Sequence, residues 1–123
     1  MVTQDTQPAG LIARLWNGTR YSLQGLRAAW THEQAFRLEV GVFLLVLPAA
    51  WWLGKDGGAR SLLIGSCGMV LVVELVNSAL EAAVDRLGPE RHELAGRAKD
   101  FGSAAVFLAI LLAGVTWALC LFG

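Results

Sequence analysis

Residues 61–85 read SLLIGSCGMVLVVELVNSALEAAVD, and this stretch decides the fold. Between Ser61 and Leu80 it carries one charged residue, Glu74. A helix needs roughly 20 apolar residues to cross the core of a bilayer. The stretch is long enough for this, so it predicts a transmembrane helix over about residues 61–86.

Residues 40–54 (VGVFLLVLPAAWWLG) form a second apolar segment without charge. The segment is short for a span, but the preceding turns extend it, so we expect a transmembrane helix over about residues 33–54. Pro48 would break a helix in water, whereas in a membrane neighbouring helices satisfy the freed carbonyl. Trp51 and Trp52 close the segment as an interfacial aromatic belt would.

Residues 101–123 are also free of charge and predict a third span over about residues 97–122. Of the 123 residues in the chain, 55% are hydrophobic and only 16% are charged. Soluble domains usually contain about a quarter charged residues, so this composition favours a membrane protein. The formal net charge of +0 argues against binding to nucleic acid.

The N-terminal part predicts a different kind of helix. Over about residues 8–30, apolar residues recur largely at helical spacing, with Arg14, Arg20 and Arg27 among them. This pattern is typical of an amphipathic helix that lies on a membrane surface. The apolar residues are Leu11, Ile12, Leu15, Trp16, Leu23, Leu26 and Trp30. The predicted fold is therefore one all-α membrane domain with a surface helix and three transmembrane helices.

The basic residues are divided unequally between the two sides of the predicted spans. Eight of the ten lie before the apolar segment 40–54 or between the apolar segments 61–80 and 101–123, and only Lys55 and Arg60 lie between the first and second segments. Cytoplasmic loops carry the excess of Lys and Arg. We therefore expect the N-terminus and the second loop in the cytoplasm, with the first loop and the C-terminus on the outer side.

A polar stripe interrupts the second predicted span, made of Glu74, Asn77, Glu81 and Asp85. At about 100° per residue, these side chains project within roughly 80° of one another. A carboxylate in the hydrocarbon layer costs roughly 2.5–3.5 kcal/mol on insertion scales, so Glu74 should face protein or water. A purely structural role, in which Glu74 joins helices through hydrogen bonds, is the alternative. Four polar residues on one face favour a functional site.

The stripe suits proton and phosphate chemistry at the cytoplasmic boundary. Glu74 could act as a general base on a weakly acidic group such as a lipid hydroxyl. Glu81 could hold Mg²⁺ with Glu33 or Asp85 as a second carboxylate, since Mg²⁺ prefers oxygen ligands and substrate phosphates. Lys99 could neutralise a phosphate. The chain has no GxxxxGK[ST] motif, so a nucleotide would be held by metal and carboxylates.

The predicted second loop is rich in polar side chains, and we expect it to be a solvated turn. It contains Glu90, His92, Glu93, Arg97, Lys99 and Asp100. His92 has no second histidine at ligand spacing, so we interpret it as a polar loop residue rather than a metal ligand.

Three segments of the chain resemble those of a known protein family: AAWTHEQAFRLE (28–39), VELVNSALEAAVDR (73–86) and HELAGRAKDFGSAAV (92–106). A fourth segment, GLRAAW (25–30), agrees with this resemblance. The pattern E-x-x-N-S-A-x-E-x-x-x-D, followed by A-K-D, is highly specific. These segments resemble the small integral-membrane diacylglycerol kinases of Gram-negative bacteria. The resemblance extends over the chain from about Arg14 onward.

The resemblance implies transfer of the γ-phosphate of MgATP to the hydroxyl of diacylglycerol, giving phosphatidic acid, in the bacterial inner membrane. It also implies a homotrimeric helical bundle with active sites between subunits at the cytoplasmic boundary. By position, Glu74 matches the catalytic base and Asn77 a supporting polar residue. Glu33 and Glu81 match metal-binding carboxylates at the nucleotide. The other positions that match nucleotide-contacting residues of the family are Arg14, Tyr21, Glu90, His92, Lys99 and Asp100. The positions that match its lipid-contacting residues are Arg27, Ala28, Ala29, Trp30, Glu74 and Ser103.

Two positions depart from the family pattern. Leu38 stands where a polar residue is expected, and Arg91 lies in the nucleotide-side turn.

Two other functions stay open. A related branch phosphorylates undecaprenol, a polyprenyl alcohol, and the sequence encodes the choice of lipid only weakly. A small proton-coupled exporter could also use one membrane glutamate, although three spans and a polar stripe that continues into a charged loop count against it.

Overall fold

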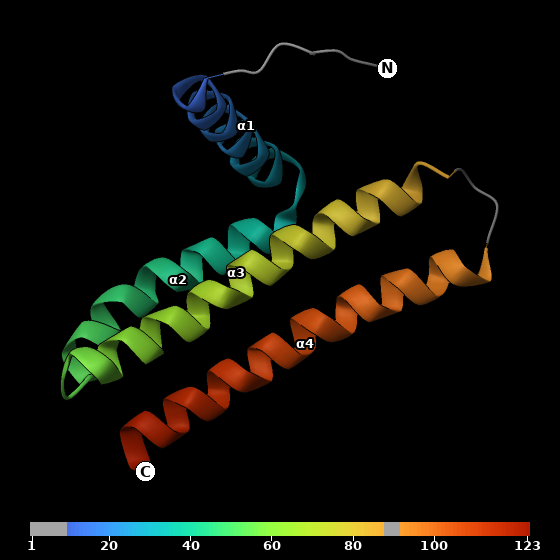
Figure 1. Ribbon diagram of the computed structural model, residues 1–123. Coiled ribbons are helices and arrows are strands. Elements are labelled where there is room, and N and C mark those ends of the chain that lie inside the picture. Colours follow the sequence, from blue (N-terminus) through green and yellow to red (C-terminus); the bar gives the residue numbers. More distant parts are fainter. Residues whose placement is uncertain (1–9, 88–91) are drawn as a thin grey trace.

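The computed structural model describes residues 10–87 and 92–123, which form four helices. In chain order they are α1 (Leu11–His32), α2 (Gln34–Leu53), α3 (Gly57–Asp85) and α4 (Glu93–Phe122). Figure 1 shows α2, α3 and α4 extending along a common direction, with α1 at a steep angle to them. Because α3 contacts both α2 and α4, it is the central helix of the bundle. The predicted all-α class is confirmed.

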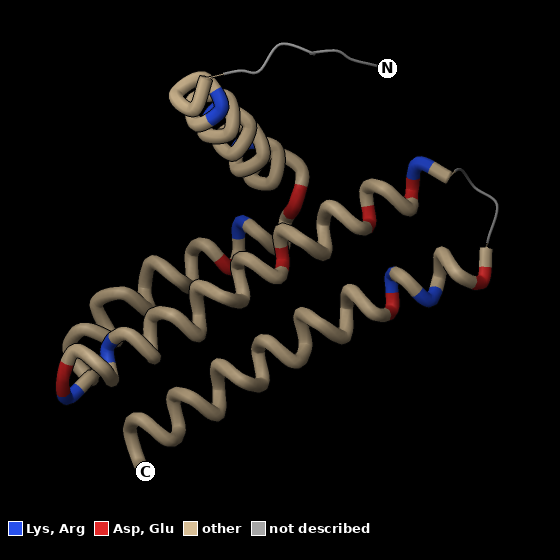
Figure 2. Tube along the Cα trace, in the orientation of Figure 1, with Lys and Arg blue, Asp and Glu red and all other residues tan. Residues whose placement is uncertain are grey.

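Three helices are long and apolar enough to cross a membrane: α2, α3 and α4. Their number agrees with the three spans predicted from the sequence. Charged residues gather toward the two ends of the bundle, and α4 carries no charge after Asp100 (Figure 2). The chain is therefore a multi-pass membrane protein.

The core of the bundle is small because most apolar side chains point outward. Leu63 is its largest fully buried side chain, and the Leu63 carbonyl accepts a 3.1 Å hydrogen bond from Nε1 of Trp117. This bond ties α3 to α4 near the end of the bundle that holds the C-terminus. The buried apolar residues in the described chain are Ala29, Phe36, Ala50, Leu63, Val70 and Ala113.

The turn between α2 and α3 depends on close packing and a helix cap. α2 continues through Pro48, as a membrane-spanning helix can. Gly54 follows it, and a Cβ atom there would lie 2.5 Å from Cγ of Arg60, so only glycine fits. Asp56 then starts α3 by accepting a 2.8 Å hydrogen bond from the backbone N–H of Ala59. Such a cap satisfies one of the unpaired N–H groups of the first turn.

α1 and α2 are separated by one residue outside the helical conformation. Glu33 has φ −113° and ψ 105°, an extended geometry that redirects the chain. Arg37 then reaches back and donates to the carbonyl of Trp30 at 2.7 Å and to that of Thr31 at 3.3 Å. A cation at these final carbonyls also interacts favourably with the helix dipole. This arrangement fixes the direction in which α1 leaves the bundle.

The third membrane-spanning helix begins earlier than predicted, before residue 97, and its charged residues are exposed as expected except for half-buried Lys99. α4 begins at Glu93, so Arg97, Lys99 and Asp100 lie on its first two turns. Glu93 in the first turn is stabilised by the positive end of the helix dipole, and it forms a 3.2 Å ion pair with Arg97 one turn later. Local charge pairing thus extends the apolar helix into the polar region.

α3 and α4 approach each other closely where Asn77 faces Gly102. Both residues are buried, and a Cβ atom on Gly102 would overlap Oδ1 of Asn77. Small residues allow helices in lipid to come this near to each other. Gly102 therefore makes room for the polar stripe of α3 against α4.

We predict that Gly102→Ala destabilises the bundle, because the added methyl group collides with the Asn77 side chain. Overpacking of this kind costs typically about 1–3 kcal/mol. Gly114→Ala is the matched control, because Gly114 lies on the same helix with open space around it. Both substitutions raise the helix propensity of α4 by the same amount, so only the collision with Asn77 differs. Thermal unfolding in detergent, followed by circular dichroism, should give a lower Tm for Gly102→Ala than for Gly114→Ala. Equal Tm values would contradict the close approach.

Candidate active site

The polar stripe of α3 points into the protein. Glu74 and Asn77 are only 6% and 8% exposed, although they lie on a membrane-spanning helix. Glu81 is half-buried one turn after Asn77, and Asp85 at the end of the helix is exposed. Burial thus decreases steadily along the stripe toward the end of α3. The stripe thus runs from a buried carboxyl in the membrane-spanning part of α3 to an exposed carboxyl at its end.

Glu39 of α2 lies beside Glu74 and interacts directly with its carboxyl group. Its Oε1 atom is buried without a hydrogen-bond partner among the residues that the structure describes. Two carboxylates in contact repel strongly where the dielectric constant is low. The pair therefore needs a proton or a cation nearby to balance it, which is a feature of reactive sites more than of structural ones.

Sequence reasoning missed Glu39 as a functional residue and treated it only as part of the extension of α2. One signal was available, since Glu39 is the last charged residue before an uninterrupted apolar run. Its side chain also borders a small cavity of about 230 Å³ between α2, α3 and α4. The other lining residues are Leu38, Val42, Phe43, Cys67, Val70, Leu71 and Ile110.

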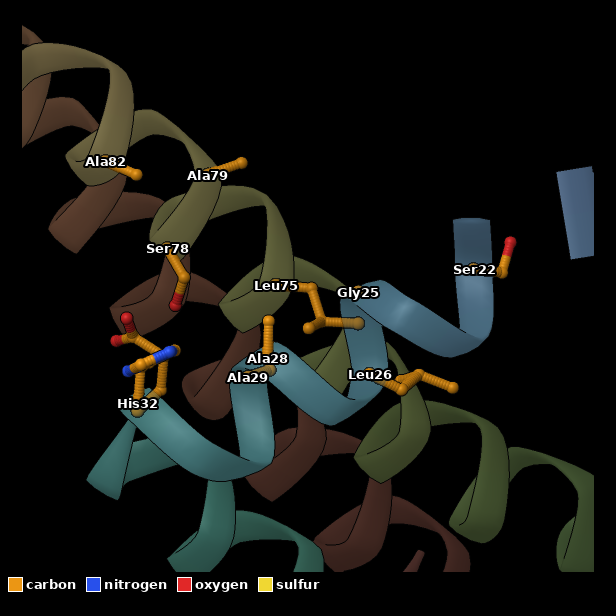
Figure 3. A pocket seen from close by; sticks show the side chains of 11 residues that line it. Ser22, Gly25, Leu26, Ala28, Ala29, His32, Leu75, Ser78, Ala79 and Ala82 are labelled. Carbon is orange, nitrogen blue, oxygen red and sulfur yellow. The ribbon is translucent and has the colours of Figure 1, made fainter. Parts of the chain in front are cut away.

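A larger cavity of about 680 Å³ lies between α1 and α3 (Figure 3). Its walls are mainly apolar, and its polar members are Ser22, His32, Glu33 and Ser78. The apolar and small lining residues are Gly25, Leu26, Ala28, Ala29, Leu75, Ala79 and Ala82. Its volume lies within the range of about 300–1,000 Å³ that is usual for small-molecule sites.

His32 and Ser78 are the second addition that the structure makes to the candidate site. The Ser78 side chain points toward His32 across the cavity (Figure 3). The Oγ atom of Ser78 is buried and has no hydrogen-bond partner within residues 10–87 and 92–123. Ser78 follows Asn77 of the stripe directly in the chain, but the sequence gave no sign that the end of α1 would lie opposite.

Lys99 on α4 forms a 2.8 Å ion pair with Asp85 on α3. Their side chains are 43% and 65% exposed, so the pair contributes only about 0–1 kcal/mol and is readily rearranged. The pair joins the charged end of the stripe to the first turns of α4. Lys99 thus lies on a helix near the end of the stripe, and its role as a phosphate-neutralising cation stays a prediction.

The other predicted site residues are distributed around this end of the molecule. Ala29 is buried and Glu33 is half-buried, and both line the α1–α3 cavity. Glu74 and Glu81 are not among the residues that line it. Glu90 lies outside the described residues. The exposed members of the predicted set are Arg14, Tyr21, Arg27, Ala28, Trp30, His92, Asp100 and Ser103.

The predicted metal ligands do not form a closed metal site within one chain. Among the described residues, no three side chains of His, Cys, Asp or Glu are close enough to hold an ion together. Mg²⁺ commonly uses one or two carboxylates and takes its remaining ligands from phosphates and water. The available donors fit a metal ion that arrives with a nucleotide, rather than one that a protein cage holds permanently.

Comparison with known proteins places this arrangement in a family. The model of prokaryotic diacylglycerol kinase matches residues 20–121. The chain is 52% identical over 111 residues to the diacylglycerol kinase of Escherichia coli strain K12, covering 90% of this chain and 91% of that protein.

More distant relatives agree with this match. The diacylglycerol kinase of Haemophilus influenzae is 47% identical over 111 residues, covering 90% of this chain and 94% of that protein. The diacylglycerol kinase of Helicobacter pylori strain 26695 is 42% identical over 104 residues, covering 85% and 81%. The similarity includes all four helices, so this chain belongs to the prokaryotic diacylglycerol kinase family.

Proposed function

We propose that this chain is a diacylglycerol kinase, which transfers the γ-phosphoryl group of ATP to the free hydroxyl of diacylglycerol and gives phosphatidic acid. The observation that carries the proposal is the buried carboxyl of Glu74 on a membrane-spanning helix, beside Glu39 and one residue from the wall of the α1–α3 cavity. This position is close to where the polar head of a membrane lipid would lie.

Glu74 acts as the general base in this proposal. Its carboxylate takes the proton of the lipid hydroxyl while that oxygen attacks the γ-phosphorus of ATP, and the bond to the β-phosphate oxygen breaks to release ADP. General-base assistance contributes typically about 10²–10⁴-fold to a rate. Asn77 holds the stripe in place against Gly102, and Glu39 positions the Glu74 carboxyl from α2.

Phosphoryl transfer depends mainly on positioning and on neutralising charge. Glu81 and Glu33 are the carboxylates that would hold Mg²⁺ together with ATP, and the bound ion would offset charge on the phosphate oxygens. Lys99 adds a cation beside them once its exposed pair with Asp85 rearranges. Arg14, Tyr21, Glu90, His92 and Asp100 complete the nucleotide-binding set in this proposal.

The α1–α3 cavity is the proposed entry for the acceptor lipid. Its apolar wall suits acyl chains, and the unpartnered Oγ of Ser78 marks a polar end. Arg27 and Trp30 on α1, and Ser103 on α4, would contact the lipid around this opening. α1 lies on the membrane surface in this arrangement, so diacylglycerol reaches the site sideways from the bilayer.

We further propose that the protein works as a homotrimer in the bacterial inner membrane. Most side chains of α4 are exposed in the single chain, with Gly102 and Ala113 as its buried residues, so α4 has surface available for neighbouring subunits. The N-terminus and the α3–α4 connection face the cytoplasm, and the C-terminus faces the periplasm.

The purified full-length protein in mixed micelles, with γ-labelled ATP, Mg²⁺ and a panel of lipid alcohols, tests the activity. We expect the label to appear in phosphatidic acid when diacylglycerol is supplied. Label transferred to undecaprenol in preference to diacylglycerol would replace the proposed acceptor with a polyprenol. No labelled lipid with any alcohol would overturn the kinase proposal.

We expect Glu74→Gln to reduce turnover by more than about 100-fold, because the amide cannot accept the proton of the lipid hydroxyl. The glutamine side chain has nearly the size and shape of glutamate, so the trimer should still form and MgATP should still bind. Phosphatidic acid formation, gel filtration in detergent and nucleotide binding measure these three properties. Glu93→Gln, at the exposed start of α4, is the control. A near-normal rate in Glu74→Gln would rule out Glu74 as the base.

We expect Glu81→Ala to raise the Mg²⁺ concentration that gives half-maximal activity by at least about tenfold, because even outer-shell partners of a metal contribute about 10–100-fold to its affinity. A titration of Mg²⁺ at fixed ATP measures the change, with Glu93→Ala as a control that removes the same charge from α4. If the titration curve is unchanged, Glu81 does not hold the metal.

A further inference from the structure

Arg60 lies at the end of the bundle where α2 turns into α3, opposite the proposed kinase site. Its guanidinium group stacks over the ring of Trp51, 4.3 Å from the centroid. Its Cγ atom packs over Gly54, as the lack of space at that glycine shows. Nε is buried and has no hydrogen-bond partner in the described parts of the chain. The arginine is therefore held firmly in place by packing.

No carboxylate within residues 10–87 and 92–123 forms an ion pair with this arginine. Asp56 is the nearest acidic residue in sequence, but its Oδ1 accepts the N–H of Ala59. A cation fixed in position without a counter-charge costs energy near an apolar phase unless a ligand supplies that charge. The Arg60 guanidinium can donate to two oxygens of one phosphate in parallel.

A cavity of about 460 Å³ lies beside the guanidinium. It is lined by Trp51, Gly57, Arg60, Ser61, Ile64 and Gly65. The hydroxyl of Ser61 already donates to the carbonyl of Gly57 at 2.7 Å, so the charge of Arg60 dominates the electrostatics of the cavity. The first turn of α3 adds the positive end of its dipole on the same side.

The surroundings of the cavity identify the source of the phosphate. Trp51 and Trp52 are 63% and 85% exposed at the end of α2, where aromatic side chains mark the level of lipid headgroups. Leu53 is also exposed beside them, and Ile64 adds an apolar wall to the cavity. A lipid could place its acyl chains along these side chains and its phosphate at the arginine, whereas a free phosphate would gain nothing from them.

We propose that Arg60 and the adjoining cavity bind the phosphate of an anionic phospholipid, such as phosphatidylglycerol, at the membrane boundary opposite the kinase site. The side chains of Lys55, Asp56 and Arg60 carry one net positive charge around the α2–α3 turn, which favours an anionic over a zwitterionic headgroup. The site is independent of catalysis, because its residues lie at the other end of α3 from Glu74.

Native mass spectrometry of the full-length protein in detergent, titrated with phosphatidylglycerol or phosphatidylcholine, tests this site. We expect the wild-type protein to retain more phosphatidylglycerol at equal lipid concentration. Arg60→Gln should lose at least about threefold of that binding, because the glutamine amide carries no charge that pairs with the phosphate. Lys55→Gln removes the same charge from an exposed neighbour and should lose less.

Three further measurements make each outcome decisive. The circular dichroism spectrum of Arg60→Gln should match that of the wild-type protein, which shows that the fold is kept. Arg60→Lys keeps the positive charge and should therefore bind more phosphatidylglycerol than Arg60→Gln does. Inorganic phosphate at millimolar concentration should not displace the lipid. Equal lipid binding by Arg60→Gln and the wild type, equal retention of the two lipids, or displacement by inorganic phosphate would each overturn the proposal.

Discussion

The burial of a carboxyl group on a membrane-spanning helix is the constraint on which the remaining structure depends. Exposure of Glu74 to acyl chains is costly, so the polar face of α3 must turn toward other helices. α2 supplies Glu39 beside it, and α4 supplies a glycine where Asn77 needs space. The central position of α3 follows from this need, because both of its neighbours must contact the same stripe.

The two ends of the bundle have different characters, and both follow from the distribution of charge (Figure 2). At one end, the gradient from buried Glu74 to exposed Asp85 leads from the membrane toward water, and α1 encloses a cavity beside it. At the other end, charge is sparse and Arg60 is held against Trp51. Membership of the prokaryotic diacylglycerol kinase family agrees with phosphoryl transfer at the first end, and it disfavours the alternative of a proton-coupled exporter.

Most of the fold could be predicted because it depends on local properties of the chain. Length and hydropathy gave the three candidate spans, and helical periodicity placed Glu74, Asn77 and Glu81 on one face. The charged residues at the start of α4 were interpreted as a solvated turn, whereas they are helical from Glu93 on, and Glu93 pairs with Arg97 one turn later. Glu39 and His32 gain significance only from side chains on other helices, so no pattern within their own segments could identify them.

The sequence by itself determined how many helices can cross the membrane, which face of α3 is polar and where the cations lie. These properties repeat every turn or sum over a segment, so neighbouring residues suffice to define them. Only the tertiary structure decided that Glu39 meets Glu74, that Gly102 admits Asn77 and that Arg60 stacks on Trp51. Such contacts depend on the crossing of helices that are distant in the chain, and the packing of whole side chains sets that crossing.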